Sequence, residues 1–364
     1  MSTPSLGRWH VPAEWERHSR CWMAWPSRAE TWPGGLEAAA AAHAELARTI
    51  AAFEPVTMLC NPDDAVDASL ACGAGIQVLP LATGGGWLRD TGPAFLVNET
   101  GGVAGIHWRF DDREAPPPGS ETTSAPGSGT TSAPGSGADA TIGKRILEHL
   151  ALPIYEAPLA LEGGAFSVDG AGTVLVTEQC LLDGRRNPGL SRSEIEEHLR
   201  ACTGATAVIW LGGGCQDDGS GGHVDEIACF VAPGVVLALT TDDPLDGNFR
   251  VLQDNLDRLT KARDARGRAL EVVTVRQPAR RPRAPAAGRL TLSYTNLYLA
   301  NGAVILPGFG DAADQEARKV LRRLFPRREV VQLPALEIAA AAAGLHRLTL
   351  HQPAALPLPY DPVI

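Results

Sequence analysis

The sequence lacks the features that mark disulfide-stabilised, zinc-binding or membrane proteins. Its seven cysteines are odd in number and irregularly spaced, and no C-x-x-C pair occurs. This argues against a disulfide framework and against structural zinc. No uninterrupted apolar run reaches membrane-spanning length, and residues 1–10 contain no apolar core of signal-peptide length. We therefore expect a cytoplasmic protein without a membrane partner.

The chain also has fewer basic than acidic residues. The chain has 32 Lys and Arg against 42 Asp and Glu residues, for a formal net charge of −10. Proteins that bind nucleic acid usually carry a basic face, so no nucleic-acid partner is expected. An acidic protein suits a cationic ligand, although many proteins are acidic for solubility alone. With 364 residues and a 44% apolar share, the chain is long enough to bury a large core.

One segment differs from the rest in composition. Residues 115–138 are nearly all Pro, Gly, Ser, Thr and Ala, and they repeat the unit Thr-Thr-Ser-Ala-Pro-Gly-Ser-Gly. Such a stretch buries too little apolar surface to offset its ordering entropy. We predict a disordered insertion in a surface loop of one domain that spans residues 1–364. A boundary between two domains is the alternative, but the strands on either side belong to the same kind of unit.

That unit is a β-hairpin, and four hairpins recur at an interval of roughly seventy residues. Ser191 and Glu194 form a predicted capping box at the start of one of the helices between them, with Leu190 and Ile195 as a hydrophobic staple. Strand pairs that alternate with helices favour an α/β ring of hairpin-plus-helix units. A doubly wound sheet is the alternative, although no G-x-G-x-x-G opens a helix. The predicted turns are 98–102, 169–172, 232–234 and 301–302, the last of them after a predicted strand over 290–300. The predicted helices are 36–53, 141–150, 191–200, 254–263 and 311–325, the last of them capped by Asp311.

Acidic and histidine side chains come directly before three of these hairpins. They are Asp90, Glu162, and the pair His223 and Asp225, and we predict that the segments with Asp90 and Asp225 are strands. In a ring of repeats, equivalent positions converge on the central axis, so these side chains are predicted to share one pocket. The i, i+2 spacing of His223 and Asp225 places both on one face of a strand. Gly163-Gly164, after Glu162, permit close backbone approach. The alternative is structural: Asp90 caps a turn and the His-x-Asp pair has no chemical role.

A cluster of this kind suits a guanidinium ion. That ion is planar, always charged, and donates hydrogen bonds from every edge. Two carboxylates can hold it with paired, charge-assisted hydrogen bonds. Attack on its central carbon by a thiolate, with histidine passing a proton to departing ammonia, hydrolyses an amidine C–N bond. No histidine cluster accompanies the carboxylates, so we expect no metal site.

The chain resembles the agmatine deiminases of the bacterial peptidyl-arginine deiminase family over nearly its whole length outside 115–138. The resemblance implies a five-bladed α/β propeller, or pentein, of ββαβ-type repeats with pseudo-fivefold symmetry. It implies the conversion of agmatine and water to N-carbamoylputrescine and ammonia, a step toward putrescine, without a cofactor. Members commonly self-associate, so a homo-oligomer is expected. The matching motifs are Trp22–Pro26, Trp87–Pro93, Leu161–Gly164, Cys180–Leu182, Arg186–Pro188, Gly222–Asp225, Ser293–Asn296, Asn301–Gly302 and Phe309–Asp311.

The same resemblance assigns roles to the clustered residues. Asp90, Asp225 and Trp87 would bind the guanidinium of a small cationic substrate or ligand. His223 would be the general acid and base, with Glu162 as its partner.

The C-terminal motif departs from the family pattern. The position of the nucleophilic cysteine holds Arg347, and the preceding glycine run has become Ala341–Ala343 before Gly344. A guanidinium is a hydrogen-bond donor without an available lone pair, so Arg347 is not expected to act as a nucleophile. The motif that contains Cys180 is expected to lie away from the site, so this thiol is not expected to replace the missing one.

Three interpretations follow from the departure. The first is a hydrolase that acts on agmatine or another guanidine through a different nucleophile or through activated water. The second is a member that binds a guanidine, another cationic ligand or a partner without turnover. In that case Arg347 would occupy the guanidinium position between Asp90 and Asp225, because buried carboxylates without a counter-charge are costly. The third is a C-terminal segment changed by sequence error or artificial alteration.

Overall fold

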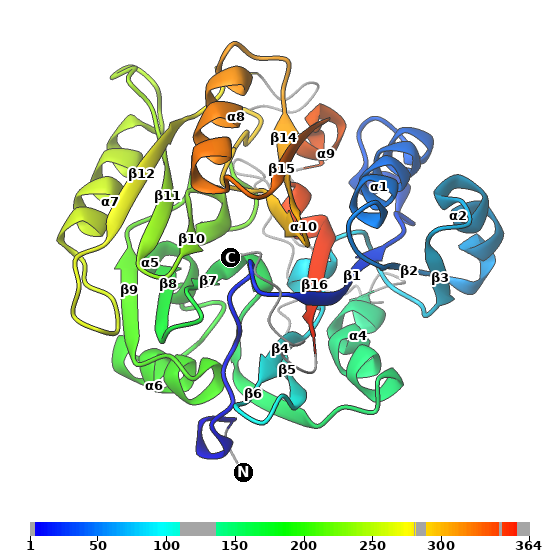
Figure 1. Ribbon diagram of the computed structural model, residues 1–364, viewed down its shortest axis with the longest axis horizontal. Coiled ribbons are helices and arrows are strands. Elements are labelled where there is room, and N and C mark those ends of the chain that lie inside the picture. The colour runs from blue at the N-terminus through cyan, green and yellow to red at the C-terminus, as the bar shows by residue number, and fades with distance from the viewer. Residues whose placement is uncertain (1–3, 110–135, 280, 282–288, 342–343, 355–364) are drawn as a thin grey trace, which may run out of the picture.

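The computed structural model describes residues 4–109, 136–279, 281, 289–341 and 344–354. Five small sheets surround a common axis, and the longer helices lie outside them (Figure 1). The chain is a five-bladed α/β propeller, as the resemblance implies. The doubly wound alternative is excluded, because every sheet contains an antiparallel pair and has only three or four strands.

Four of the blades repeat one strand order. Two strands form an antiparallel hairpin, and the third strand pairs parallel to the second after a helical connection. This is the expected ββαβ repeat. The four sheets consist of β4 (Ala94–Val97), β5 (Val103–Arg109) and β6 (Ile154–Ala160); β7 (Phe166–Val168), β8 (Thr173–Thr177) and β9 (Ala207–Leu211); β10 (Ala228–Ala232), β11 (Val235–Thr240) and β12 (Glu271–Arg276); and β13 (Tyr298–Ala300), β14 (Ala303–Gly308) and β15 (Glu329–Pro334).

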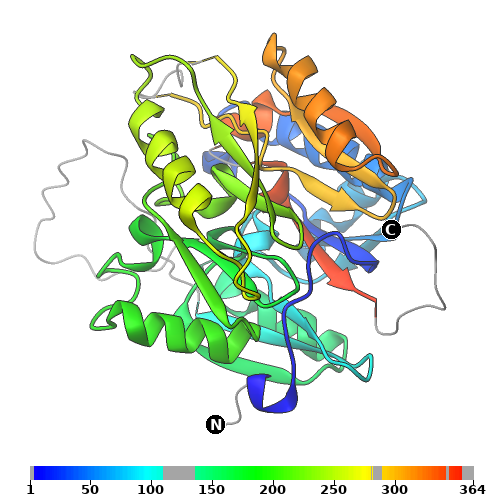
Figure 2. The same cartoon turned by 60° about the vertical axis from the view of Figure 1, so that its left-hand side comes forward.

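The fifth blade joins the two ends of the described chain. β16 (Thr349–Pro353) pairs antiparallel with β1 (His18–Ala24). β1 pairs parallel with β2 (Val56–Cys60), which pairs parallel with β3 (Gln77–Pro80). β1 and β16 lie side by side in both views (Figure 1; Figure 2). Hydrogen bonds between the first and last strands therefore close the ring.

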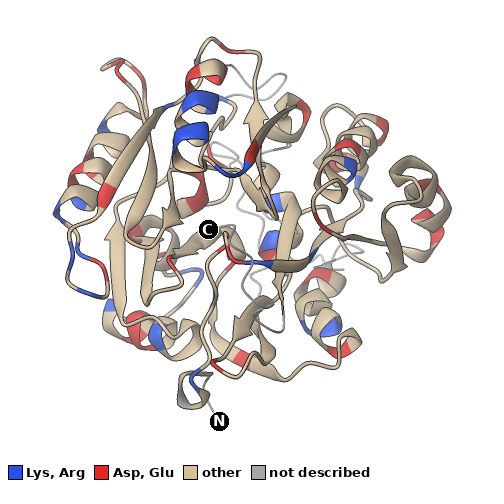
Figure 3. Cartoon of the chain, viewed as in Figure 1, with Lys and Arg blue, Asp and Glu red and all other residues tan. Residues whose placement is uncertain are grey.

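The longer helices cover the outside of the ring and turn their apolar side toward the strands. In α7, Leu252 and Leu259 are buried, and many charged residues lie on these outer helices (Figure 3). The longer helices are α1 (Leu36–Ala51), α2 (Ala65–Cys72), α4 (Ser136–His149), α6 (Arg192–Thr203), α7 (Phe249–Lys261) and α8 (Ala313–Leu324). The short ones are η1 (Pro4–Gly7), η2 (Ala29–Thr31), η3 (Pro62–Asp64), α3 (Leu88–Thr91), η4 (Gly163–Ala165), α5 (Glu178–Leu181), η5 (Val224–Glu226), α9 (Leu336–Ala340) and α10 (Leu345–Leu348), where η marks a 3-10 helix.

The middle strands of the blades form much of the core. β2, β8 and β14 are buried along their whole length. A strand that is paired on both sides and covered on both faces reads as a continuous apolar run rather than an alternating one. These runs are therefore a consequence of their central position.

Two predicted helix starts have different outcomes. The capping box is confirmed, because Ser191 Oγ accepts a hydrogen bond from Glu194 N (3.3 Å) and Glu194 Oε2 accepts one from Ser191 N (2.8 Å). The prediction that Asp311 caps α8 is wrong, since the N-cap is Ala312. Asp311 Oδ1 instead accepts from Ala313 N at 2.9 Å, which makes an Asx-type turn just before the helix.

The four predicted hairpin turns are confirmed, but the strand predicted at 290–300 is reduced to β13. Residues 293–296 turn toward other blades instead, and Thr295 Oγ1 donates to Asp225 O at 2.9 Å. Of the predicted insertion, residues 115–135 lie outside the described part of the chain, and residues 136–138 begin α4. Among the described residues, no helix combines the length and apolarity that a membrane crossing requires.

Candidate functional site

Four short helical turns, α3, η4, η5 and α10, contact one another at the centre of the ring. The sequence predicts strands for the segments with Asp90 and Asp225, and this is wrong: Asp90 lies in α3 and Asp225 in η5. The backbone of these two turns makes local hydrogen bonds. Gly92 N donates to Leu88 O at 2.8 Å and Ile227 N to Val224 O at 3.0 Å.

The structure brings the predicted acidic residues and histidine together. The exposed fractions of Asp90, Glu162, His223 and Asp225 are 6%, 6%, 2% and 2%. His223 Nε2 lies 3.5 Å from Glu162 Oε2, and His223 Nδ1 lies 3.9 Å from Asp90 Oδ1. A Cβ atom at Gly164 would lie 2.8 Å from both Asp225 Oδ2 and His223 Nδ1. The prediction of close backbone approach at this glycine is therefore confirmed.

The guanidinium of Arg347 lies in this cluster. Its Nε and Nη2 donate to Asp90 Oδ2 at 2.8 and 2.6 Å, and its Cζ lies 5.1 Å from the centre of the Trp87 ring. Burial opposes ionisation of Asp90, but the charge and hydrogen bond of Arg347, with smaller contributions from His223 and Gly164, together outweigh it and lower the pKa of that carboxyl. Asp90 and Trp87 thus hold a guanidinium that belongs to the chain itself, by an ion pair and a cation–π contact.

The Asp225 side of the cluster is tied to residues that the sequence analysis does not single out. Asp225 Oδ2 accepts from His346 Nδ1 (2.8 Å) and from Asn296 Nδ2 (3.1 Å). Asn296 also accepts from His346 N and donates to Glu226 Oε1. Burial and the charge of Asp225 raise the pKa of Glu226 well above its usual value, which favours its neutral form. Asn296, in the Ser293–Asn296 motif, and His346, which matches the C-terminal family motif beside Arg347, carry a signal in the sequence.

His346 continues the network away from the cluster. Its Nε2 donates to Glu14 Oε1 at 2.7 Å, and Arg89 Nη1 donates to the same oxygen at 2.7 Å. Burial and the charge of Arg89 act to lower the pKa of His346, but Glu14 and Asp225 outweigh them and raise it. Glu14 lies more than 300 residues before His346 in the chain, in a segment without any sequence motif of its own, so only the structure identifies it.

This contact predicts a pH dependence. The folded state raises the pKa of His346 above the ordinary 6.5, so its contribution to stability is complete below about pH 6.5 and is lost as pH rises through the raised pKa. Urea unfolding of the parent and a His346→Gln variant, from mildly acidic to mildly alkaline pH, measures this. The stability difference should shrink with rising pH, by about 1.4 kcal/mol for each unit of the shift. A pH-independent difference would contradict the charged state of His346.

The other catalytic candidates have a different environment. Burial lowers the pKa of His223 despite the opposing charge of Asp90, so its imidazole is neutral at neutral pH. Arg186 Nη1 makes a very close contact with Glu162 Oε2, the oxygen that also faces His223. The prediction that Glu162 partners His223 agrees with this distance, but the carboxylate is shared with an arginine.

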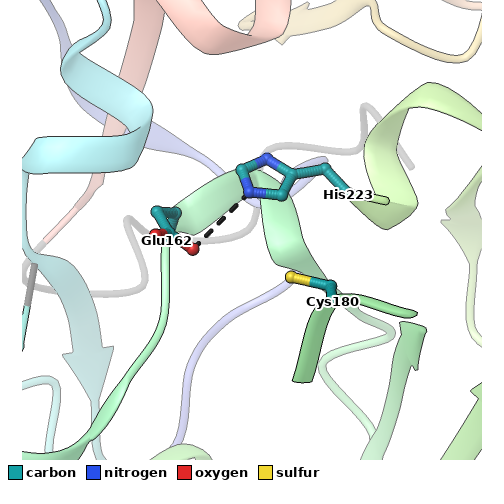
Figure 4. A group of neighbouring side chains, drawn as sticks. All are labelled: Glu162, Cys180 and His223. Atoms are coloured by element: carbon teal, nitrogen blue, oxygen red, sulfur yellow. Dashed lines mark ion pairs between the residues drawn. The ribbon is translucent and has the colours of Figure 1, made fainter. Parts of the chain in front are cut away.

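The expectation that Cys180 lies away from the site is wrong. Its Sγ, a ring nitrogen of His223 and a carboxylate oxygen of Glu162 all lie within 4.8 Å of one another (Figure 4). The Thr177 hydroxyl accepts a hydrogen bond from Cys180 N (3.2 Å) and donates one to Gly222 O (2.5 Å). These two bonds hold α5 against the segment before His223, and this places Cys180 beside the site. Burial and nearby carboxylates raise the pKa of the Cys180 thiol, so it is not a thiolate at neutral pH.

Known proteins share this arrangement of the chain. The Porphyromonas-type peptidyl-arginine deiminase family matches residues 10–353. A Legionella pneumophila protein is 41% identical over 356 residues, or 97% of each chain. The agmatine deiminase of Stutzerimonas stutzeri is 37% identical over 371 residues, 97% of this chain and 98% of that one. The solved agmatine deiminase of Enterococcus faecalis has a TM-score of 0.89 and 29% identity, covering 98% of this chain and 99% of the other.

Proposed function

Because the chain belongs to the Porphyromonas-type peptidyl-arginine deiminase family, we propose that its central cluster recognises the guanidinium of a small cationic guanidine such as agmatine. The position of Arg347 carries this proposal. Its guanidinium lies against the Asp90 carboxylate and over the Trp87 ring, so the cluster already accepts the group that such a ligand would present. Asp225, also buried beside the cluster, supplies a second negative charge.

The proposed activity is binding without thiol-based turnover. Agmatine deiminase chemistry would convert agmatine and water to N-carbamoylputrescine and ammonia, a step in putrescine biosynthesis. Covalent catalysis of that step needs a nucleophile beside the guanidinium carbon. Arg347 has no lone pair to offer, and the Cys180 thiol is protonated in its buried setting. A ligand guanidinium would compete with Arg347 for Asp90, and no cofactor takes part.

A second candidate function is direct hydrolysis by water. The neutral imidazole of His223, 3.5 Å from the Glu162 carboxylate, favours it. In this route His223 takes a proton from water as the oxygen attacks the guanidinium carbon. It then returns the proton to the nitrogen that leaves as ammonia, so the products are those of the thiol route. A cytoplasmic location, self-association and a single domain over residues 1–364 are further predictions from the sequence.

The proposed function predicts that the parent protein binds agmatine and releases no ammonia from it. Calorimetric titration measures binding, with putrescine as a matched control because it keeps an amine-bearing chain and lacks the guanidinium. An ammonia assay at high protein concentration measures turnover, with His223→Gln as its background. Ammonia release that disappears in His223→Gln would establish the second candidate instead. Failure of both the parent and Arg347→Ala to distinguish agmatine from putrescine would refute guanidinium recognition.

A further inference from the structure

We propose that Glu162, Cys180 and His223 form a binding site for a divalent transition-metal ion, with Zn²⁺ as the best fit. The sequence analysis predicts no metal site, because these residues lie in three separate motifs and form no histidine cluster. The fold brings them to one place, where each of the three residues offers one ligand atom (Figure 4). This inference concerns a different ligand from guanidinium recognition and does not depend on it.

The ligand types and spacing suit zinc. Cysteine sulfur, histidine nitrogen and glutamate oxygen are its protein ligands, and three of them with one open position are typical of catalytic zinc sites. Zinc bonds of about 2.0–2.3 Å in a tetrahedron place the ligand atoms roughly 3.3–3.8 Å apart. His223 Nε2 and Glu162 Oε2 are 3.5 Å apart, and all three ligand atoms lie within 4.8 Å. A side-chain adjustment of about 1 Å completes the tetrahedron.

The second ring nitrogen of His223 faces a carboxylate, although it makes no hydrogen bond to it. Histidine that binds a metal usually donates its other N–H to a carboxylate or carbonyl, which fixes the ring. His223 Nδ1 is buried and has no hydrogen-bond partner among the described residues, and it faces Asp90 Oδ1 at 3.9 Å. Nε2, on the other side of the ring, is the nitrogen that faces Glu162. The ring is thus oriented with one nitrogen toward the proposed ion and the other toward a carboxylate.

The charged groups around the three ligands determine which existing contacts a bound ion would have to replace. Asp90 and Asp225 disfavour a Cys180 thiolate, and a bound dication would reverse that effect. Arg186 contacts one oxygen of Glu162, but its Nη2 also lies 3.4 Å from Ser220 O, so the guanidinium has a second anchor. Arg186 and the ion would both use Oε2 of Glu162, so the ion must displace the Nη1 contact while Arg186 keeps its bond to Ser220 O.

Metal titration of the chelator-treated full chain tests the proposal. Zn²⁺ alone is titrated by calorimetry, and Co²⁺ alone is followed by absorption spectroscopy. We expect one ion per chain and a thiolate-to-cobalt charge-transfer band. Cys180→Ser should remove the band and weaken Zn²⁺ binding by at least about 100-fold. Cys215→Ser, at a buried cysteine outside the cluster, is the matched control and should change neither result.

A second variant keeps the test decisive if Cys180→Ser does not fold. Glu162→Gln retains the thiol, so it should keep the charge-transfer band while weakening Zn²⁺ binding. Circular dichroism shows which variants are folded. Absence of Zn²⁺ binding by the folded parent would overturn the proposal, as would full binding by both variants or a cobalt band that Cys215→Ser removes. No guanidine enters these measurements, so their failure is distinct from a failure of guanidinium recognition.

Discussion

Replacing Arg347 with cysteine is expected to produce ammonia release from agmatine. Without the long Arg347 side chain, the position beside Asp90 and Trp87 would be open to the guanidinium of agmatine, with the new thiol on the residue 347 side of it and His223 and Glu162 in place to handle protons. Loss of a nucleophile costs an enzyme about 10⁶-fold in kcat, so we expect its return to raise the rate at least about 10³-fold over Arg347→Ala. A steady-state ammonia assay with agmatine measures this gain.

Three controls test whether ammonia release depends on the new thiol or only on the removal of the Arg347 side chain. Arg347→Ala removes the guanidinium without adding a nucleophile, and Arg347→Ser adds only a hydroxyl; neither should release ammonia above background. Alkylation of the Arg347→Cys variant should abolish its activity. A folded Arg347→Cys variant that binds agmatine without releasing ammonia would contradict the expectation. It would show that the surrounding residues do not have the geometry of a hydrolase.

Removing the side chain of Arg347 is also expected to destabilise the protein strongly. Asp90 is 6% exposed, and Arg347→Ala leaves its carboxylate buried without the ion pair. Breaking a buried ion pair by removing one partner costs about 3–5 kcal/mol. Urea unfolding measures the loss. The matched control is Asp90→Asn combined with Arg347→Met, which removes both charges and should be much closer to the parent, since a buried pair can be replaced by neutral groups at little cost.

The Arg347→Ala variant should bind agmatine more tightly than the parent does. The vacated position beside Asp90 needs a cation, and agmatine can supply one with the same chemical group as Arg347. Agmatine should therefore raise the melting temperature of Arg347→Ala more than that of the parent, while putrescine has little effect on either. Equal agmatine affinity in the parent and in Arg347→Ala would show that Arg347 does not compete for this position.

Local patterns in the sequence predict the hairpins and helices well. The Asn301-Gly302 turn and the Ser191 capping box depend on residues close together in the chain, so they are visible without the fold. The convergence of Asp90, Glu162 and His223 follows from repetition, because equivalent positions in a ring meet at its axis. The predicted convergence of these three side chains is therefore confirmed, even though the segments with Asp90 and Asp225 are helical turns rather than strands.

The rest of the site depends on tertiary contacts that no local pattern encodes. Glu14 meets His346 only because the ring closes, and its segment has no motif of its own. Cys180 reaches His223 through the Thr177 hydroxyl, a contact that cannot be derived from spacing. In both cases a side chain is placed by a hydrogen bond to a segment distant in sequence, and sequence periodicity does not report such bonds.

Ring closure by β1 and β16 has a consequence for synthesis on the ribosome. His18–Ala24 is translated long before its partner Thr349–Pro353. Until β16 is made, the ring of the nascent chain cannot close. Arg347, whose charge is paired with Asp90, is also still missing at that stage. Contacts between such distant segments form slowly. A chain cut short by a premature stop codon would keep an unpaired strand edge and offer a ready target for quality-control proteases.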